Sequence, residues 1–256
     1  MIAIRSEDEI KTLRSVCRLA AEAMEVAQEA VRPGITTRQI SDRVQDYIES
    51  NGARAAFLGY NGFPGAICVS VNEEVVHGIP GDRMLKEGDI VKLDIGTYKN
   101  GFYGDMARSY PVGEISSEAG VLVRTAEEAF FEGVRQVAAG NKVGDIGFVI
   151  QQFVEKRGYG VVRALVGHGI GRNIHEEPQV PNFGARGSGA RLRKGMVLAI
   201  EPMITLGDWE VKVLDDNWTI VTADGTLSAH YENTCVVRED TAEILTLMNG
   251  EEGFLS

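Results

Sequence analysis

An internal repeat with a fixed offset of 106 residues constrains the fold of this chain more than any other feature. An amphipathic segment near residues 40–52 returns, with the same or similar residue types, near residues 146–158. The matched pairs are Ile40 and Ile146, Val44 and Ile150, Gln45 and Gln151, Tyr47 and Phe153, Ile48 and Val154, Glu49 and Glu155, and Gly52 and Gly158. A constant spacing indicates a duplicated structural unit, although two amphipathic helices with a generic pattern explain the matches equally well.

Helical patterns precede and include both copies of the repeat. Ser6 and Glu9 form a capping-box pattern, and apolar residues then recur at three- and four-residue spacing. Pro33 and Gly34 end this helix, and a second helix covers the first copy of the repeat. A further long helix is predicted at about 117–139, before the second copy.

Strand-like runs follow each helical block. They cover residues 67–71, 90–98, 196–205, 211–214, 218–222 and 231–238. Helices and strands in comparable amounts, with hairpin turns among the strands, predict an α+β fold built around antiparallel sheet. No low-complexity linker divides the 256 residues. We therefore expect a single domain with two halves of about 1–112 and 113–256.

The composition argues against several classes of protein. With 37 acidic and 26 basic side chains the net charge is −11, whereas nucleic-acid binders use Lys and Arg to neutralise phosphates. No apolar run approaches the ~18 residues of a membrane span, and no signal or transit peptide is visible. Three widely spaced cysteines without a CxxC pattern argue against a disulfide framework. We expect a cytoplasmic protein.

Two aspartates lie on a predicted hairpin, Asp94 on its first strand and Asp105 on its second. A turn centred on Lys99-Asn100 places them directly opposite each other, and a turn centred on Asn100-Gly101 makes them diagonal neighbours. Both registers put the two carboxylates on one face of the sheet. Like charges at this spacing are unfavourable unless a cation lies between them. The pair is a candidate metal site, and the alternative is that one aspartate faces solvent or caps a turn.

Three further residues carry metal-binding groups. His168 stands between Gly167 and Gly169, which predicts little side-chain packing around it and an open approach for a ligand. Glu201 ends one apolar strand and Glu232 leads into another. Charges at the ends of buried strands are unusual unless they are paired or bound to metal. Each glutamate is equally compatible with a structural ion pair.

Taken together, these five residues carry four negative charges and one neutral imidazole. Two divalent cations neutralise the four charges, whereas one cation leaves the cluster uncompensated. Carboxylate oxygens with one imidazole nitrogen suit Mn, Fe(II), Co or Zn, and the thiolates of a structural zinc site are missing. The candidate ligands are Asp94, Asp105, His168, Glu201 and Glu232.

Several long motifs resemble those of the type I methionine aminopeptidases. They lie at residues 59–64, 68–73, 77–80, 167–171, 175–178, 201–203 and 231–232. Their order and spacing match this family across essentially the whole chain. Thirty residues separate Glu201 from Glu232, which leaves no room for the helical insertion of the type II enzymes.

The resemblance implies the pita-bread fold, in which two pseudo-symmetric halves surround a dinuclear metal centre. It assigns Asp94, Asp105 and Glu232 to one metal, and it assigns His168 and Glu201, with the bridging Asp105 and Glu232, to the second. A metal-bridging water or hydroxide is then the nucleophile, and Glu201 passes its proton to the leaving amine. The implied reaction removes the initiator methionine from nascent proteins and peptides whose second residue is small.

The resemblance also implies how the substrate is held. His175 hydrogen-bonds the scissile carbonyl as negative charge develops, and His77 contacts the scissile amide. The methionine thioether lies in an apolar pocket that suits sulfur contacts. The implied pocket residues are Tyr60, Phe63, Cys68 and Trp218. For the three aromatic residues, the sequence alone favours ordinary core packing.

Two positions depart from the family pattern. Ile174 stands where the family usually has an aromatic residue, and Phe57 stands where small residues or Cys are common. Both substitutions are expected to change the shape of the pocket and to leave the metal chemistry intact.

A basic cluster in a glycine-rich loop breaks the acidic trend of the chain. Its members are Arg186, Arg191, Arg193 and Lys194. Because the family acts on nascent chains, the cluster is a candidate for docking at the ribosome, whereas basic runs of this kind are usually solvated loops. Family analogy predicts a monomer.

Two alternatives share the same fold. Proline-specific peptidases share the GHGIG-type motif but usually carry a large N-terminal domain, and this chain begins almost at its catalytic domain. A non-catalytic binding protein of this fold loses metal ligands, whereas all five ligand positions and both auxiliary histidines are present here.

Overall fold

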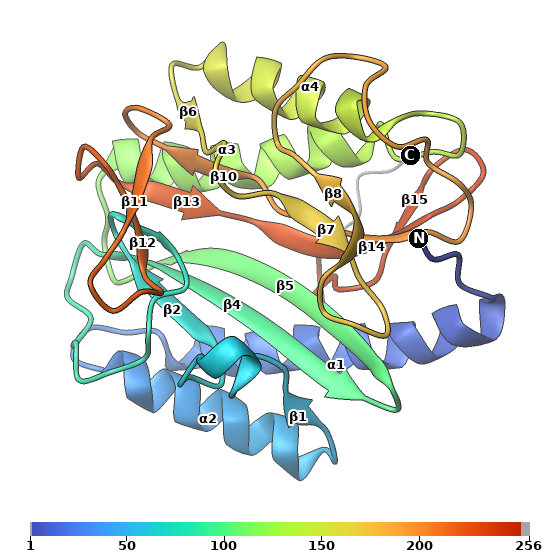
Figure 1. Cartoon of the computed structure of the whole chain (residues 1–256). Helices are drawn as coiled ribbons and strands as arrows, with labels where there is room; N and C mark the ends of the chain where they lie inside the picture. Colours follow the sequence, from blue (N-terminus) through green and yellow to red (C-terminus); the bar gives the residue numbers. More distant parts are fainter. Residues whose placement is uncertain (1, 252–256) are drawn as a thin grey trace.

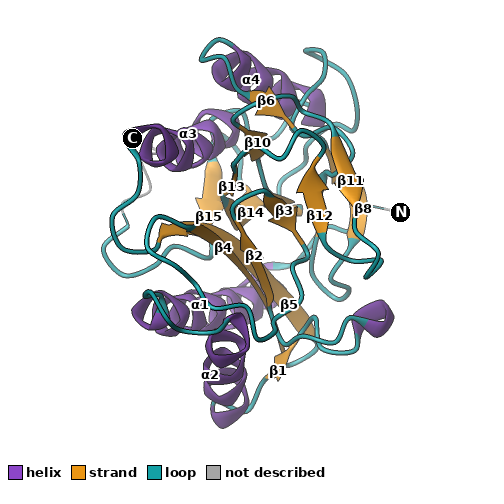
Figure 2. Cartoon of the chain, turned by 90° about the vertical axis from the view of Figure 1, so that its left-hand side faces the viewer, coloured by secondary structure: helices purple, strands orange, loops and turns teal. Residues whose placement is uncertain are grey.

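The structure is a computed structural model that describes residues 2–251 (Figure 1). Its α-helices are α1 (Glu7–Ala30), α2 (Thr37–Ser50), α3 (Ser117–Val134) and α4 (Val143–Glu155), and Tyr60–Gly62 form a short 3-10 helix. The strands lie between the helix pair α1 and α2 and the helix pair α3 and α4 (Figure 2). No helix in this part of the chain combines the length and the apolar character needed to cross a membrane.

A nine-stranded antiparallel sheet forms the centre, in the order β1-β4-β5-β14-β9-β7-β8, with β2 beside β4 and β15 beside β14. Its strands are β1 (Arg54–Ala55), β2 (Cys68–Val71), β4 (Ile90–Lys99), β5 (Phe102–Pro111), β7 (Gly167–Gly169), β8 (Glu176–Val180), β9 (Val197–Ile200), β14 (Glu232–Val237) and β15 (Ala242–Ile244). The predicted α+β fold with antiparallel sheet is confirmed.

Two three-stranded sheets complete the fold. One has the order β13-β10-β6 and the other β11-β12-β3. Their strands are β3 (Glu74–Val76), β6 (Gly160–Val161), β10 (Met203–Thr205), β11 (Val211–Val213), β12 (Ile220–Thr222) and β13 (Ser228–His230). The second sheet joins β3 from the first part of the chain to the hairpin β11–β12 from the last part.

The N-terminal helix begins where the sequence predicts. Ser6 Oγ accepts a hydrogen bond from Glu9 N at 3.3 Å, and the Glu9 carboxylate accepts one from Ser6 N at 3.0 Å. This reciprocal pair satisfies two backbone donors that a helix start otherwise leaves open. The apolar face of α1, including Leu13 and Met24, is fully buried and lies over β4 and β5.

The repeated segment forms equivalent helices in the two helix pairs. Helix α2 begins at Thr37 and α4 at Val143, which preserves the offset of 106 residues. Each packs against the preceding long helix, α2 on α1 and α4 on α3. The match therefore reflects the same role in two helix pairs, while the exact boundary of the halves near residue 112 stays a prediction.

Helix α3 ends at Val134, so the prediction that it extends to residue 139 was wrong. Gln136 N bonds to Gly133 O and Val137 N to Val134 O, which are tighter turns than those of an α-helix. Ala139 N then donates to backbone carbonyls near the C-terminal end of β14. Tight turns thus follow the helix, and the chain then makes a long-range backbone contact that periodicity cannot reveal.

The run at residues 196–205, predicted as one strand, forms two strands in different sheets. Strand β9 belongs to the central sheet and β10 to the β13-β10-β6 sheet. The chain changes sheet at Glu201-Pro202, where proline cannot donate to a ladder. The carbonyl of Glu201 is satisfied by Asn182 Nδ2 at 2.9 Å.

Candidate metal centre

The hairpin β4–β5 positions the two aspartates. Asn100 and Gly101 have φ values of 54° and 81°, as a two-residue type I′ turn requires. In the resulting register Asp105 lies opposite Gly96. Because Asp94 is two residues from Gly96, both carboxylates lie on the same face of the sheet. This confirms the second of the two registers considered, in which the aspartates are diagonal neighbours.

The face that carries the aspartates is turned away from the helices. Leu93 and Ile95, the neighbours of Asp94, belong to the apolar core under α1 and α2. Side chains alternate along a strand, so Asp94 points to the opposite face. Burial of the apolar neighbours thus fixes the direction of the acidic side chain.

The other candidate ligands come from three strands of the second half. His168 is the central residue of β7, Glu201 directly follows β9, and Glu232 begins β14. His168 Nε2 lies 3.9 Å from Asp105 Oδ2 and 3.6 Å from Glu201 Oε1. His168 Nδ1 is 3.0 Å from the carbonyl oxygen of Gly169. That bond fixes the proton on Nδ1 and leaves Nε2 as an acceptor for a metal.

The glycines beside His168 have a role in backbone packing that the sequence interpretation did not assign to them. A Cβ at Gly167 would lie 2.4 Å from Ala199 O, and a Cβ at Gly169 would lie 2.3 Å from Glu177 O. The glycines allow the neighbouring strands β9 and β8 to approach β7 closely. As a result His168 is only 8% exposed.

These residues fit a divalent cation. Ligand atoms of Asp105, His168 and Glu232 all lie within 4.8 Å of one another. Asp105 Oδ1 is buried and has no hydrogen-bond partner within residues 2–251. Divalent transition metals bind ligands at about 2.0–2.2 Å, so ligands of one metal lie up to about 4.4 Å apart, a spacing that these atoms approach. The short distances and the unpaired carboxylate oxygen match such a site.

Burial dominates the electrostatics of the cluster. It raises the pKa of Asp94 to about 7. Burial, and next the neighbouring Asp94, raise the pKa values of Asp105 and Glu201 well above their usual range. Burial also lowers the pKa of His168 to about 4, so the imidazole is neutral at pH 7. Ionised carboxylates this close together are costly without a cation, which a metal ion supplies.

We expect the metal-stripped protein to lose stability as the pH rises. The folded-state pKa of Asp94 is raised from 3.8 to about 7, so its contribution is complete below about pH 4 and is lost as the pH rises toward 7. Glu232, with a pKa also raised by burial, acts in the same direction. The Tm should fall by at least about 5 °C between pH 5 and pH 8. Calorimetry of metal-saturated protein is the control and should show no such fall, while a constant or rising Tm without metal would contradict the prediction.

A cavity of about 290 Å³ adjoins the cluster. Its lining contains all five candidate ligands and all six residues expected to bind substrate. These six are Tyr60, Phe63, Cys68, His77, His175 and Trp218. The edge of Phe63 meets Trp218, with ring centroids 5.1 Å apart. The structure therefore places the aromatic residues around a cavity, and their contacts with substrate stay a prediction.

The two auxiliary histidines lie at the same cavity. His175 Nδ1 is 2.8 Å from the hydroxyl of Tyr60, and the ring of His175 is centred 4.4 Å from that of His168. The ring of His77 stands edge-on to Trp218 at 6.4 Å. Burial lowers the pKa of both His77 and His175, which favours neutral imidazoles at pH 7.

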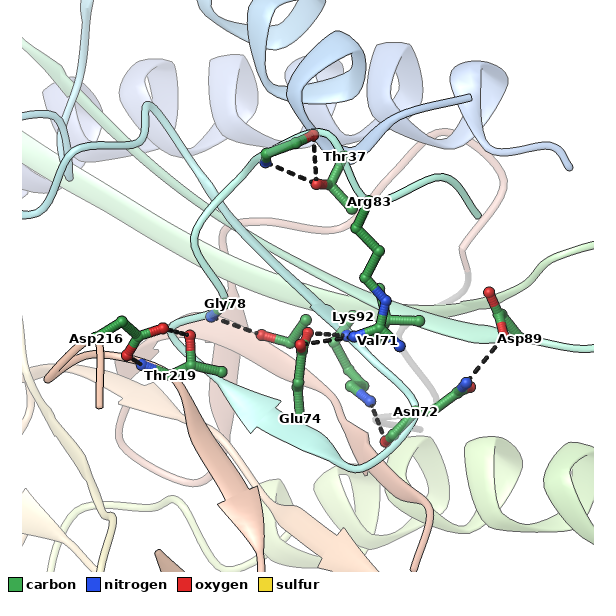
Figure 3. Close-up of polar contacts among 12 residues, drawn as sticks. Thr37, Val71, Asn72, Glu74, Gly78, Arg83, Asp89, Lys92, Asp216 and Thr219 are labelled. Atoms are coloured by element: carbon green, nitrogen blue, oxygen red, sulfur yellow. Dashed lines mark hydrogen bonds and ion pairs between the residues drawn. The ribbon is translucent and has the colours of Figure 1, made fainter. Parts of the chain in front are cut away.

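Polar contacts fix the segments that carry His77 and Trp218 (Figure 3). Gly78 N donates to Ser70 Oγ at 3.0 Å, and Asp216 accepts hydrogen bonds from Trp218 N and from the hydroxyl of Thr219. These bonds hold both residues in place before substrate binds.

A buried lysine supports the turn before β3. Lys92 Nζ donates to the carbonyl of Asn72 at 2.6 Å, and Asn72 Nδ2 donates to Asp89 Oδ1 at 2.8 Å (Figure 3). Lys92 also reaches the carbonyl of Ser228 at 3.3 Å. The lysine thus connects the turn to β13, next to the cavity.

The sequence interpretation missed some residues of the cavity. His230 and Met203 line it, although neither was assigned a role. Strand alternation was the available signal for His230, which stands two residues before Glu232. Phe57 lines the cavity as expected, whereas Ile174 is buried and lies outside the lining, so any effect of Ile174 on the pocket is indirect.

Comparisons with known proteins agree with this geometry. The model of metallopeptidase family M24 matches residues 11–239. A methionine aminopeptidase from Clostridium perfringens is 50% identical over 248 residues, which cover 97% of this chain and 100% of that protein. The crystal structure of methionine aminopeptidase from Rickettsia prowazekii has a TM-score of 0.95 and 41% identity, and the match covers 96% of this chain and 100% of that chain.

A more distant likeness concerns the fold alone. The crystal structure of the prolidase from Pyrococcus horikoshii OT3 has a TM-score of 0.79 at 23% identity. The match covers 97% of this chain and 64% of that one.

Proposed function

The chain belongs to metallopeptidase family M24, and on this basis we propose that it releases the N-terminal methionine of peptides and nascent proteins whose second residue is small. It is a metal-dependent aminopeptidase with the pita-bread fold. One observation carries the proposal: a buried cluster of four carboxylates and one imidazole adjoins a cavity of about 290 Å³ with aromatic and sulfur-containing walls. The walls suit a methionine side chain, and the cluster suits metal-assisted hydrolysis.

The ligand set proposed here serves two divalent cations. Asp94, Asp105 and Glu232 hold one, and His168 and Glu201 hold the second with Asp105 and Glu232 as shared ligands. The separations of 3.6 and 3.9 Å around His168 Nε2 support this assignment. When bound, the metals supply Lewis-acid chemistry and make water nucleophilic at neutral pH.

Glu201 is proposed to move the proton. Its side chain is nearly buried beside His168, and burial raises the pKa of its carboxyl group. A carboxylate of raised proton affinity accepts a proton from the attacking water and returns it to the leaving amine.

The two auxiliary histidines are proposed to hold the scissile amide. Tyr60 Oη lies 2.8 Å from His175 Nδ1, and in the tautomer proposed here the hydroxyl donates to Nδ1 and the ring proton of His175 is on Nε2. That N–H is then available to the scissile carbonyl as negative charge develops. His77, on the same cavity, contacts the amide on its leaving-group side.

A peptide assay with metal-stripped protein tests this function. We expect release of methionine from Met-Ala-Ser when Mn, Fe(II), Co or Zn is restored, and little release from Met-Ile-Ser. The Asp94→Ala variant should fail to release methionine with any of these metals. No release with any metal, or hydrolysis of an Xaa-Pro dipeptide in its place, would overturn the proposal.

Docking of the basic cluster at the ribosome, a cytoplasmic location and a monomeric state stay predictions. Part of the cluster is engaged within the chain. The guanidinium of Arg186 lies 4.7 Å from the centre of the Phe148 ring, and Arg191 Nη1 donates to Gly140 O at 2.8 Å.

A further inference from the structure

His230 is a buried residue of the cavity to which the reaction gives no role. It ends β13 and is 1% exposed. Its backbone is fixed, because His230 N donates to Ser109 Oγ and Ser109 Oγ donates to His230 O, both at 2.9 Å. The imidazole therefore occupies a defined place in the cavity wall.

Both ring nitrogens of His230 lack a hydrogen-bond partner within residues 2–251. His230 Nε2 lies 3.9 Å from Glu232 Oε2, which is too far for a hydrogen bond. An imidazole carries at least one N–H in every protonation state, and a buried donor without a partner is costly. A group that enters the cavity and accepts a hydrogen bond would therefore satisfy this donor.

The surroundings of His230 favour a weakly polar partner. Met203 pairs with His230 in the β10–β13 register and lines the same cavity. Val76, Phe63 and Trp218 add further apolar wall. Glu232 and the other carboxylates lie on the metal side of the cavity. On the apolar side, a thioether suits the wall because it combines apolar bulk with a weakly accepting sulfur.

We propose that His230 donates a hydrogen bond from its ring to the thioether sulfur of the substrate's N-terminal methionine and is thereby a specificity-determining residue. This inference rests on the proposed function. Norleucine has nearly the shape of methionine but carries a methylene in place of sulfur. With norleucine in the pocket the buried N–H stays unpaired, and a site built around a donor rejects the analogue that cannot accept.

The test compares Met-Ala-Ser with norleucyl-Ala-Ser as substrates of the metal-loaded enzyme. We expect kcat/KM to favour methionine about tenfold, a modest preference because sulfur is a weak acceptor. The difference should lie in KM, since the bond is the same in the ground state and the transition state. In His230→Leu, which removes the donor, the ratio should fall to at most about twofold. In His230→Gln, which retains an N–H donor, the ratio should stay above about fivefold.

The other outcomes are distinguishable. A wild-type ratio near one, an unchanged ratio in His230→Leu or a collapsed ratio in His230→Gln overturns the inference. If His230→Leu slows both peptides equally and weakens binding of Mn in a titration without substrate, His230 orients Glu232, directly or through a water molecule, and the inference is wrong. Absence of methionine release by the wild-type enzyme would instead count against the proposed function.

Discussion

Asp105→Asn is expected to abolish methionine release, with a loss in kcat/KM of at least about a thousandfold. Asp105 is 4% exposed, and one of its oxygens has no hydrogen-bond partner in the described part of the chain. Asparagine has the same size as aspartate, but it removes the negative charge that the two proposed cations share. Its amide also turns N–H donors toward the cations. Breaking one buried charge pair costs about 3–5 kcal/mol, and a loss of about 4 kcal/mol corresponds to about a thousandfold in rate. Because Asp105 is a proposed ligand of both cations, we expect a loss of at least this size.

The same variant should affect the metal-free protein in the opposite direction. Without a cation, the charge of Asp105 is opposed by burial and by Asp94 and Glu201, so its removal should raise the Tm of the metal-stripped protein at pH 8. Kinetics, elemental analysis of bound metal and calorimetry provide the three measurements. Asp82→Asn is the matched control, because the Asp82 side chain is 94% exposed. Retained metal and activity in Asp105→Asn would show that Asp105 is not a ligand.

Glu201→Gln is expected to lower kcat by about 10²–10⁴-fold and to leave KM nearly unchanged. Glu201 Oε1 lies 3.6 Å from His168 Nε2. Glutamine keeps the size of this side chain, but it cannot accept and return a proton. The effect therefore falls on the chemical step.

Steady-state kinetics on Met-Ala-Ser across pH, at saturating metal, measure this change. The limb of the pH profile that reports the proton-accepting group should disappear. Glu177→Gln, an identical change at an exposed position close to His175, should retain wild-type kinetics. If activity in Glu201→Gln returns to the wild-type level at high metal concentration, Glu201 serves only as a ligand.

Much of the site was predictable because the relevant signals are local. Alternation on β4 places Asp94 opposite to its apolar neighbours, and the two possible turn centres left only two registers. The sequence alone did not decide between them, since Lys99-Asn100 and Asn100-Gly101 both resemble turns. The structure uses Asn100-Gly101 because both residues adopt positive φ, and glycine and asparagine tolerate this conformation best.

The features that the sequence did not reveal depend on contacts between distant segments of the chain. The glycines around His168 serve the close approach of β8 and β9, and nothing near residue 168 in the sequence identifies these neighbours. Helix α3 ends at Val134, and Ala139, which was predicted to be helical, bonds instead to the carbonyls of Arg238 and Glu239 just after β14. No role was predicted for His230, because only the folded cavity wall shows that its ring nitrogens lack hydrogen-bond partners among the described residues.

The position of β14 in the sheet has a consequence for the folding of this protein during its synthesis. Strand β14 (Glu232–Val237) lies between β5 and β9, so both of its neighbours are synthesised before the strand that joins them in the sheet. Until it arrives, the facing edges of β5 and β9 lack their partner, and unpaired edges invite association with other chains. Because Glu232 is a proposed ligand, the metal centre is also incomplete until then. The activity of the protein thus depends on a strand that is synthesised after the elements that carry the other four proposed ligands.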